Sequence, residues 1–400
     1  MPEATSTTAL PAHSTLELEV IQACARTEWA GDFEQRIGQL LQHGIDWPHL
    51  VRLAIDHQVL PLVYQSFKRW PQGSIPPEVA AECQQHTGAV LRNNLCLLAK
   101  LFQVLQLLSE ADIPCIPYKG PPLAVLAYGG NFGLRPFGDL DILVPPEAYE
   151  KTLDVFRARG YAEGADWGWE SSMVDPADGV AVDIHRAITP IRFPVQLDFA
   201  RLHGRLQSLP VAGREIRSFG PEDMLIILCI QLAKDSWGSS PLRLSKICDI
   251  AELLRTQPEM DWEFVSREAR QLGCQGILFL GLTLAHELLG APLPRLRIKA
   301  PSRNKLASLS AHVLDKLLNQ TAPDYVGLVE RDRFHFLIRE RWRDKVFPYF
   351  HDFSQSFVPS ERDRQFLRLP RLLDPLYFLV RPLRVASDLL HAVRVNARSR

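Results

Sequence analysis

Two aspartates in the middle of the chain have a spacing that suits chemistry on a phosphate. Asp139 and Asp141 belong to the segment Asp139-Leu-Asp-Ile-Leu-Val, which is apolar and bounded by Gly and Pro, as short strands are. Because side chains alternate along a strand, both carboxylates emerge on one face, about 6.6 Å apart along the strand. Such a pair is costly unless it is solvated or neutralised by a cation, and hard oxygen ligands of this kind suit Mg²⁺.

A third carboxylate, Asp183, occurs in another apolar segment, residues 180–185. If this strand lies beside the first, the three acids converge. Three carboxylates on neighbouring strands can hold two Mg²⁺ ions about 3.5–4 Å apart, one activating an attacking hydroxyl and one gripping a triphosphate and its leaving pyrophosphate. The three aspartates therefore predict transfer of a phosphoryl-type group by positioning and charge neutralisation, with all three as catalytic and metal-binding residues.

Residues upstream of the aspartates suit a triphosphate. Gly120 lets the backbone approach a ligand at a helix N-terminus, where the helix dipole favours phosphate. Lys119 and Arg135 are candidate cationic partners for the nucleotide, although Arg135 also suits a brace that pairs with a carboxylate. His185 is on the same strand face as Asp183, and a structural histidine that donates to a carboxylate is as plausible as one that contacts substrate.

For several other polar and aromatic residues the sequence allows either a functional or a structural role. Lys234, Lys246 and Asp249 occur at helical spacing and either meet the nucleotide or form a solvated face. Trp167 and Trp169, which we place on a strand, either stack a base or shield the sheet, and packing is the safer interpretation.

The elements around these residues alternate between strand and helix. Strands are expected within 113–118, 140–144 and 180–185, and helices within 121–129 and 145–160, each with Pro near its start and Gly at its end. The order is strand, helix, strand, helix, then two strands joined through 175–179. This order predicts an α/β unit with a mixed sheet.

Helical periodicity dominates on both sides of that unit. Apolar residues recur every three or four positions up to about residue 110, where one long helix begins near Pro77, and again after about residue 220. We therefore predict an α+β fold with a disordered tail at 1–13, an N-terminal helical region at 14–111, a small mixed-sheet core at 112–220 and a C-terminal helical region at 221–400.

Composition limits the classes of function. The 400 residues are 46% hydrophobic, and 45 Lys and Arg balance 46 Asp and Glu, so the net charge is −1. No dense basic groove is evident, which disfavours long nucleic acid as a partner. No stretch is long and apolar enough to span a membrane, the start lacks a secretory signal, and the seven scattered cysteines read as reduced thiols. We expect a cytoplasmic protein, and its oligomeric state is left open.

The string from Lys119 to Val144, followed by Val182-Asp-Ile-His185, resembles a family of bacterial nucleotidyltransferases within the polymerase-beta-like nucleotidyltransferase superfamily. The resemblance extends over most of residues 15–390, and its specific part is 118–186. It implies that Asp139 and Asp141 are primary metal ligands, that Asp183 orients or deprotonates the acceptor, and that Gly120 marks the phosphate loop.

The function implied is Mg²⁺-dependent transfer of a nucleoside monophosphate from ATP or another NTP to a hydroxyl or phosphate acceptor, with release of pyrophosphate. The acceptor is a small molecule, a peptide or a protein. Two alternatives stay open: a non-catalytic module that binds a nucleotide or a protein on the same scaffold, and a kinase-type phosphotransferase.

Two departures from the superfamily pattern stand out. The superfamily has Gly-Ser in the phosphate loop, whereas Pro121 and Pro122 follow Gly120 here and lack backbone N–H donors. Lys119 or Arg135 must then compensate. Gln231 occupies a position where the relatives usually have His.

Overall fold

The structure is a computed structural model, and it describes residues 16–29, 31–237, 241–294, 296, 300–318, 333–342 and 344–345. The tail expected at 1–13 lies outside these residues. The chain divides into two compact units, residues 1–338 and 339–400, and every element named below belongs to the first unit. Within the described residues, no helix is long and apolar enough to cross a membrane.

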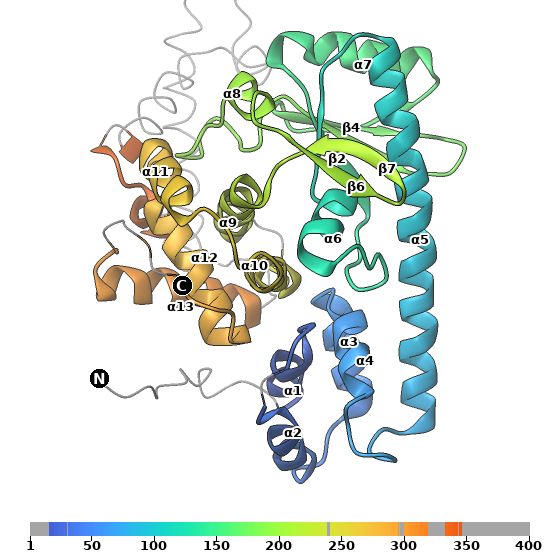
Figure 1. Ribbon diagram of the computed structural model, residues 1–400, viewed down its shortest axis with the longest axis vertical. Coiled ribbons are helices and arrows are strands. Elements are labelled where there is room, and N and C mark those ends of the chain that lie inside the picture. The colour runs from blue at the N-terminus through green and yellow to red at the C-terminus, as the bar shows by residue number, and fades with distance from the viewer. Residues whose placement is uncertain are drawn as a thin grey trace, which may run out of the picture. The chain divides into compact units, whose positions relative to one another are not determined.

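The N-terminal part is helical, as the sequence predicts. Short helices α1 to α4 form one cluster, in which α3 and α4 pack against the long helix α5. Helix α5 extends along the edge of the unit to the sheet (Figure 1). The N-cap of α3 is Asp46, whose carboxylate accepts a hydrogen bond from the backbone N–H of His49. The five helices are α1 (Leu16–Cys24), α2 (Phe33–Leu41), α3 (Trp47–Asp56), α4 (Leu60–Phe67) and α5 (Pro77–Glu110).

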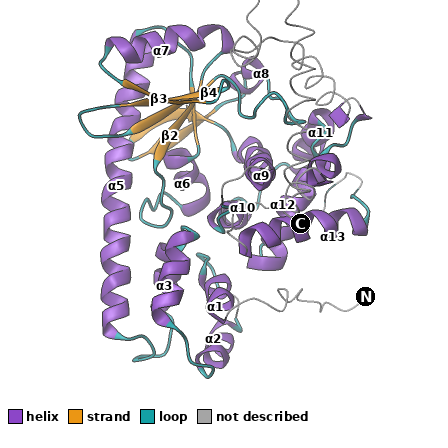
Figure 2. Ribbon diagram, turned by 180° about the vertical axis from the view of Figure 1, so that it is seen from behind, coloured by secondary structure: helices purple, strands orange, loops and turns teal. Residues whose placement is uncertain are grey.

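The sheet has five strands in the order β1-β2-β5-β4-β3. Strands β2 and β5 run parallel and the other neighbours are antiparallel, so the sheet is mixed, as predicted (Figure 2). A parallel pair needs a long crossover, and α7, β3 and β4 supply it. The strands are β1 (Ile116–Tyr118), β2 (Asp139–Leu143), β3 (Ala162–Asp166), β4 (Glu170–Val174) and β5 (Ala181–His185), and the helices between them are α6 (Gly120–Tyr128), the short 3-10 turn Pro146–Ala148 and α7 (Tyr149–Ala158).

Helices return after the sheet. Helix α10 packs against α6, α9 and α12 and so joins the sheet unit to the C-terminal helices. The Thr256 hydroxyl and the Gln257 amide at its end both donate to the carbonyl of Leu126 in α6, at 2.7 and 2.9 Å. The remaining elements are α8 (Phe199–His203), β6 (Gln207–Val211), β7 (Arg214–Ser218), α9 (Pro221–Trp237), α10 (Ser245–Thr256), α11 (Trp262–Leu272), α12 (Gln275–Leu289) and α13 (Arg303–Leu318).

Two features differ from the sequence prediction. Strand β3 and the β6–β7 hairpin were not expected. All five residues of β3 are exposed, and the buried apolar residues of the hairpin strands are only Leu209, Val211 and Ile216, too few for a clear alternating pattern. Trp167 and Trp169 lie in the turn between β3 and β4 and not on a strand. Gly168 between them has a φ of +78° and donates to the Asp166 carboxylate at 2.8 Å, which turns the chain.

Candidate active site

The register of the parallel pair brings the three aspartates together. Asp141 on β2 lies directly opposite Asp183 on β5, and Asp139 precedes Asp141 by two residues on the same strand. Registered neighbours in a sheet share a face, and so do residues two apart. The three carboxylates therefore belong to one face of the sheet, as the sequence predicts for adjacent strands.

The Asp141 carboxylate is buried and held by two cationic or polar partners. Its Oδ1 lies 2.6 Å from Lys119 Nζ and 3.0 Å from His185 Nε2. Burial by itself raises the pKa of Asp141, but Lys119 and His185 outweigh it and hold this pKa well below its usual range. Asp141 is therefore a permanent anion at neutral pH.

The other two carboxylates are less well compensated. Asp139 is open to solvent at the start of β2, and within the described residues its side chain makes no hydrogen bond. The protein atoms around it and the charge of Asp141 raise its pKa to about 6. Burial and Asp141 also raise the pKa of Asp183, against a hydrogen bond from Ser172. The sheet face that carries the three aspartates thus has more negative charge than the surrounding cations neutralise.

The three aspartates have the right chemistry for a divalent cation, but their side chains are not arranged around one in this structure. Carboxylate oxygens are the ligands Mg²⁺ prefers, and the raised pKa of Asp139 marks an excess of negative charge that a cation would relieve. In the described part of the chain, however, no group of three His, Cys, Asp or Glu side chains is arranged to hold a metal ion. Instead, Lys119 forms an ion pair with Asp141.

A strained turn places Lys119 there. Lys119 follows β1 with φ 57° and ψ −152°, a region that is essentially reserved for glycine. Gly120, with φ +39°, then begins α6, and Pro121 and Pro122 fill the first turn, where missing N–H groups cost no intrahelical bond. A lysine in such a conformation costs about 1–3 kcal/mol, which is typical of functional sites.

His185 joins the aspartates to Glu170. Its Nε2 faces Asp141, and its Nδ1 lies 3.1 Å from Glu170 Oε2 on β4. Burial by itself lowers the pKa of His185, but the two carboxylates raise it overall. The rings of Tyr118 and Trp169 each lie 5.5 Å from the imidazole. The structure therefore shows His185 bonded to a carboxylate, one of the two roles that the sequence left open.

Three charged residues of the helical region face the same site. Lys246 Nζ lies 3.0 Å and Lys234 Nζ 3.4 Å from the carboxylate of Asp235, at the end of α9 and the start of α10. Burial opposes ionisation of Asp235, yet Lys246, Lys234 and Lys119 lower its pKa to about 2. Lys234 also lies 4.7 Å from the centre of the Trp169 ring. A cationic cluster thus extends from Lys119 to α9 and α10.

Arg135 is paired with a carboxylate of the helical region. Its Nε and Nη2 donate to the two oxygens of Asp249 at 2.7 and 2.9 Å, and Tyr128 donates to the same carboxylate at 2.8 Å. Burial opposes the charge of Arg135, but Asp249 raises its pKa overall. The carboxylate partner that the sequence considered for Arg135 is thus Asp249 on α10. Asp249 is buried, so it does not belong to a solvated face. Phosphate binding by Arg135 stays a prediction.

Two asparagines of α5 hold the loop that leads into β2, and the sequence did not single them out. The Asn94 amide donates to the carbonyls of Phe132 and Arg135 at 2.6 and 2.8 Å, and the Asn93 amide donates to that of Phe137 at 3.1 Å. Asn94 has no exposed surface. The one signal that could have identified them is an Asn-Asn pair inside a long apolar helical pattern.

The structure thus gathers Lys119, Gly120, Asp139, Asp141 and Asp183 around one end of β2 and β5. Their roles toward metal and nucleotide stay predictions.

Comparison with known sequences identifies one family. The sequence model of a family described as uncharacterised nucleotidyltransferase matches residues 43–290, which is more than half of the chain. No curated protein matches the sequence.

Three solved structures show a distant likeness. The lincomycin-bound lincosamide antibiotic adenylyltransferase LnuA has 17% identity and a TM-score of 0.30, covering 39% of this chain and 94% of that one. The antibiotic-resistance factor ANT(2'')-Ia has 13% identity and a TM-score of 0.32, with 44% and 92% covered. An antigenic nucleotidyltransferase-like protein from Paracoccidioides brasiliensis has 14% identity and a TM-score of 0.28, with 52% and 94% covered. Likenesses this low carry no argument about the substrate.

Proposed function

We propose a specific reaction for this chain, which belongs to the uncharacterised nucleotidyltransferase family: transfer of a nucleoside monophosphate from an NTP to a hydroxyl or phosphate acceptor at the site of Asp139, Asp141 and Asp183. The observation that carries the proposal is the register of β2 and β5, which sets Asp141 opposite Asp183. In this reaction an acceptor oxygen bonds to the α-phosphorus. The bond from that phosphorus to the β-phosphate oxygen breaks, and pyrophosphate leaves.

Asp139 and Asp141 would hold Mg²⁺, with Asp183 beside them as the third carboxylate. When bound, the ions neutralise charge on the triphosphate and on the attacking oxygen. The family membership supports the nucleotidyl transfer, and the excess negative charge around Asp139 supports the cation.

The chain's own cations would bind the triphosphate. Asp235 interacts electrostatically with three lysines at the site, Lys119, Lys234 and Lys246. An NTP that enters there therefore meets three ammonium groups. Catalysis of this type depends on positioning and on neutralising charge, and fixed ammonium groups supply both. Gly120 allows the turn beside Asp139, because its φ of +39° is a conformation that residues with a side chain rarely adopt.

Asp183 would receive the proton of the acceptor. Its pKa is raised by burial and by Asp141, which makes it a better base than an ordinary aspartate. His185, which is buried, would act as a positioning residue because it contacts Asp141, and Glu170 would act through its contact with His185.

The test uses the full chain with each of the four NTPs, labelled at the α-phosphate, and a mixture of small-molecule, peptide and protein acceptors. We expect Mg²⁺-dependent release of pyrophosphate and transfer of the label to an acceptor. Asp141→Asn should lose this activity, whereas Arg52→Gln, at an exposed position of α3, should keep it.

The leaving group separates the alternatives. Release of a nucleoside diphosphate without pyrophosphate would indicate a kinase-type phosphotransferase. Binding of an NTP with no transfer to any acceptor, in wild type and Asp141→Asn alike, would indicate a binding module. Either result contradicts the proposed transfer.

A further inference from the structure

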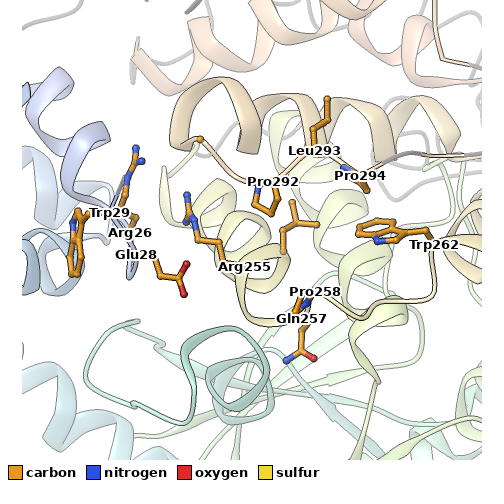
Figure 3. Close-up of a pocket in the computed structure, with 12 residues that line it drawn as sticks. Arg26, Glu28, Trp29, Arg255, Gln257, Pro258, Trp262, Pro292, Leu293 and Pro294 are labelled. Carbon is orange, nitrogen blue, oxygen red and sulfur yellow. The ribbon is translucent and has the colours of Figure 1, made fainter. Parts of the chain in front are cut away.

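A cavity of about 530 Å³ lies away from the aspartates, between the end of α1, the end of α10, the start of α11 and the end of α12 (Figure 3). This volume falls within the range of about 300–1,000 Å³ that is usual for small-molecule sites. Arg255 lines the cavity near the end of α10, whereas Lys246 at the start of α10 belongs to the aspartate site. At about 1.5 Å per residue, the two lie about 14 Å apart along the helix.

One end of the cavity is charged. Arg26, Glu28 and Arg255 gather there, as Figure 3 shows. Arg255 forms an ion pair with Glu252 and also donates to the carbonyl of Leu289. Glu28 is exposed to solvent. Water therefore screens the charge of Glu28, and Arg26 is the cation at this end that forms no ion pair among the residues that the structure describes.

Arg26 lacks an anionic partner. It donates from Nη2 to the carbonyl of Gln22 at 3.0 Å, but within the described residues no carboxylate lies within 4.0 Å of its guanidinium. Its Nε is buried and has no hydrogen-bond partner. Burial and the neighbouring cations Arg255 and Arg36 lower the pKa of Arg26 to about 10, although the charges of Cys24 and Glu252 oppose this shift. A guanidinium in this position is a charge that an anion in the cavity would compensate.

The other end of the cavity is apolar. Pro258, Trp262, Pro292, Leu293 and Pro294 form it, with the indole of Trp262 at the far side from the arginines (Figure 3). Flat apolar groups pack well on indole and proline rings. The cavity therefore combines one unmatched cation with an apolar wall.

We propose that this cavity binds a small organic oxyanion, with its carboxylate or phosphate on Arg26 and a flat apolar body between Trp262 and the prolines. The site is separate from the nucleotidyl transfer, and its occupation is measured without any activity.

Binding to the full chain is measured by isothermal titration calorimetry with indole-3-acetate, 1-naphthyl phosphate and the neutral indole-3-acetamide. We expect at least one of the two oxyanions to bind saturably and the neutral amide to bind at least about tenfold more weakly, because charge-assisted hydrogen bonds to Arg26 are lost. A preference between the two oxyanions identifies the headgroup as carboxylate or phosphate.

Variants locate the bound oxyanion. Arg26→Gln should weaken binding by about tenfold or more, and Arg26→Lys should restore part of it. If Arg26→Gln fails to fold, Leu293→Glu provides the same test, because Leu293 is 57% exposed and a carboxylate there repels the ligand. Arg52→Gln and Asp141→Asn should bind as wild type does.

Three results would overturn the proposal. One is the absence of saturable binding by both oxyanions. Another is binding of the amide as tight as that of the acid, or binding that is unchanged in both Arg26→Gln and Leu293→Glu. The last is loss of binding in Asp141→Asn, since it would assign the oxyanion to the aspartate site.

Discussion

Arg135 and Asp249, 114 residues apart in the chain, form a two-point ion pair that joins the loop before β2 to α10. Asp249 has no exposed surface, and the Arg135 side chain is 10% exposed. Because Lys246 lies one turn before Asp249 on α10, the same pair fixes the distance between the aspartates and a lysine of the helical region.

Removal of one partner of this pair should be costly. Asp249→Asn leaves the Arg135 charge buried, and breaking a buried pair in this way typically lowers the free energy of unfolding by about 3–5 kcal/mol. Replacement of both, Arg135→Met with Asp249→Leu, should recover most of the loss. Urea unfolding checks both. Equal stability of Asp249→Asn and wild type would show that the pair does not matter for the fold.

Asp139 should make stability depend on pH. Its pKa in the folded protein is about 6, above its ordinary value of about 3.9. The folded state therefore holds a proton that the unfolded state has lost, and the free energy of unfolding should fall as the pH rises from about 4 to about 6. The effect is limited to about 1 kcal/mol because Asp139 is exposed to solvent.

Urea titrations at pH 4.5 and pH 7 measure this difference. Asp139→Asn should reduce this difference by the contribution of Asp139, whereas Asp154→Asn, at an exposed position of α7, should leave it unchanged. An Asp139→Asn protein with the wild-type pH dependence would contradict the assignment.

Asn94 should be needed for both stability and activity. Asn94→Leu leaves the carbonyls of Phe132 and Arg135 buried without their donor, which typically costs about 1–3 kcal/mol per group. The loop before Asp139 would then lose its position, so we expect a lower kcat even below the unfolding temperature. Asn93→Leu, which removes a single hydrogen bond, is the matched control and should have a smaller effect. The free energy of unfolding and kcat of the two variants are compared.

The lysines of α9 and α10 should act on NTP binding. Lys246→Met and Lys234→Met each remove one cation from the cluster around Asp235, so KM for the NTP should rise by about fivefold to tenfold with a smaller change in kcat. Steady-state kinetics separates the two parameters. A change confined to kcat would show that the lysines position the reacting groups and do not bind the triphosphate.

The parts of the site that lie within one segment could be predicted from the sequence. Asp139 and Asp141 share a strand, so their common face follows from alternation, and the helix at Gly120 follows from its Pro start and Gly end. The mixed sheet and the helices on both sides follow from the order of patterns along the chain. These features can be predicted because they depend on residues that are close together in the sequence.

The parts that depend on long-range partners could not be predicted. Nothing near Arg135 in the sequence shows that Asp249 is its partner, and nothing near His185 shows that Glu170 lies beside it. The β6–β7 hairpin packs on α6 and β1, and its few buried apolar residues, Leu209, Val211 and Ile216, do not mark two strands in the sequence. In each case the deciding contact comes from an element that only the fold brings close.

The length of α5 has a practical consequence for dissecting the protein. Its middle carries Asn93 and Asn94, which hold the loop before the aspartate strand, and the same helix packs against α4. A shortened protein that begins at residue 112 would lose both asparagines together with the N-terminal helices. Attempts to isolate a minimal enzyme should therefore keep the N-terminal helices, however dispensable a region without catalytic side chains looks.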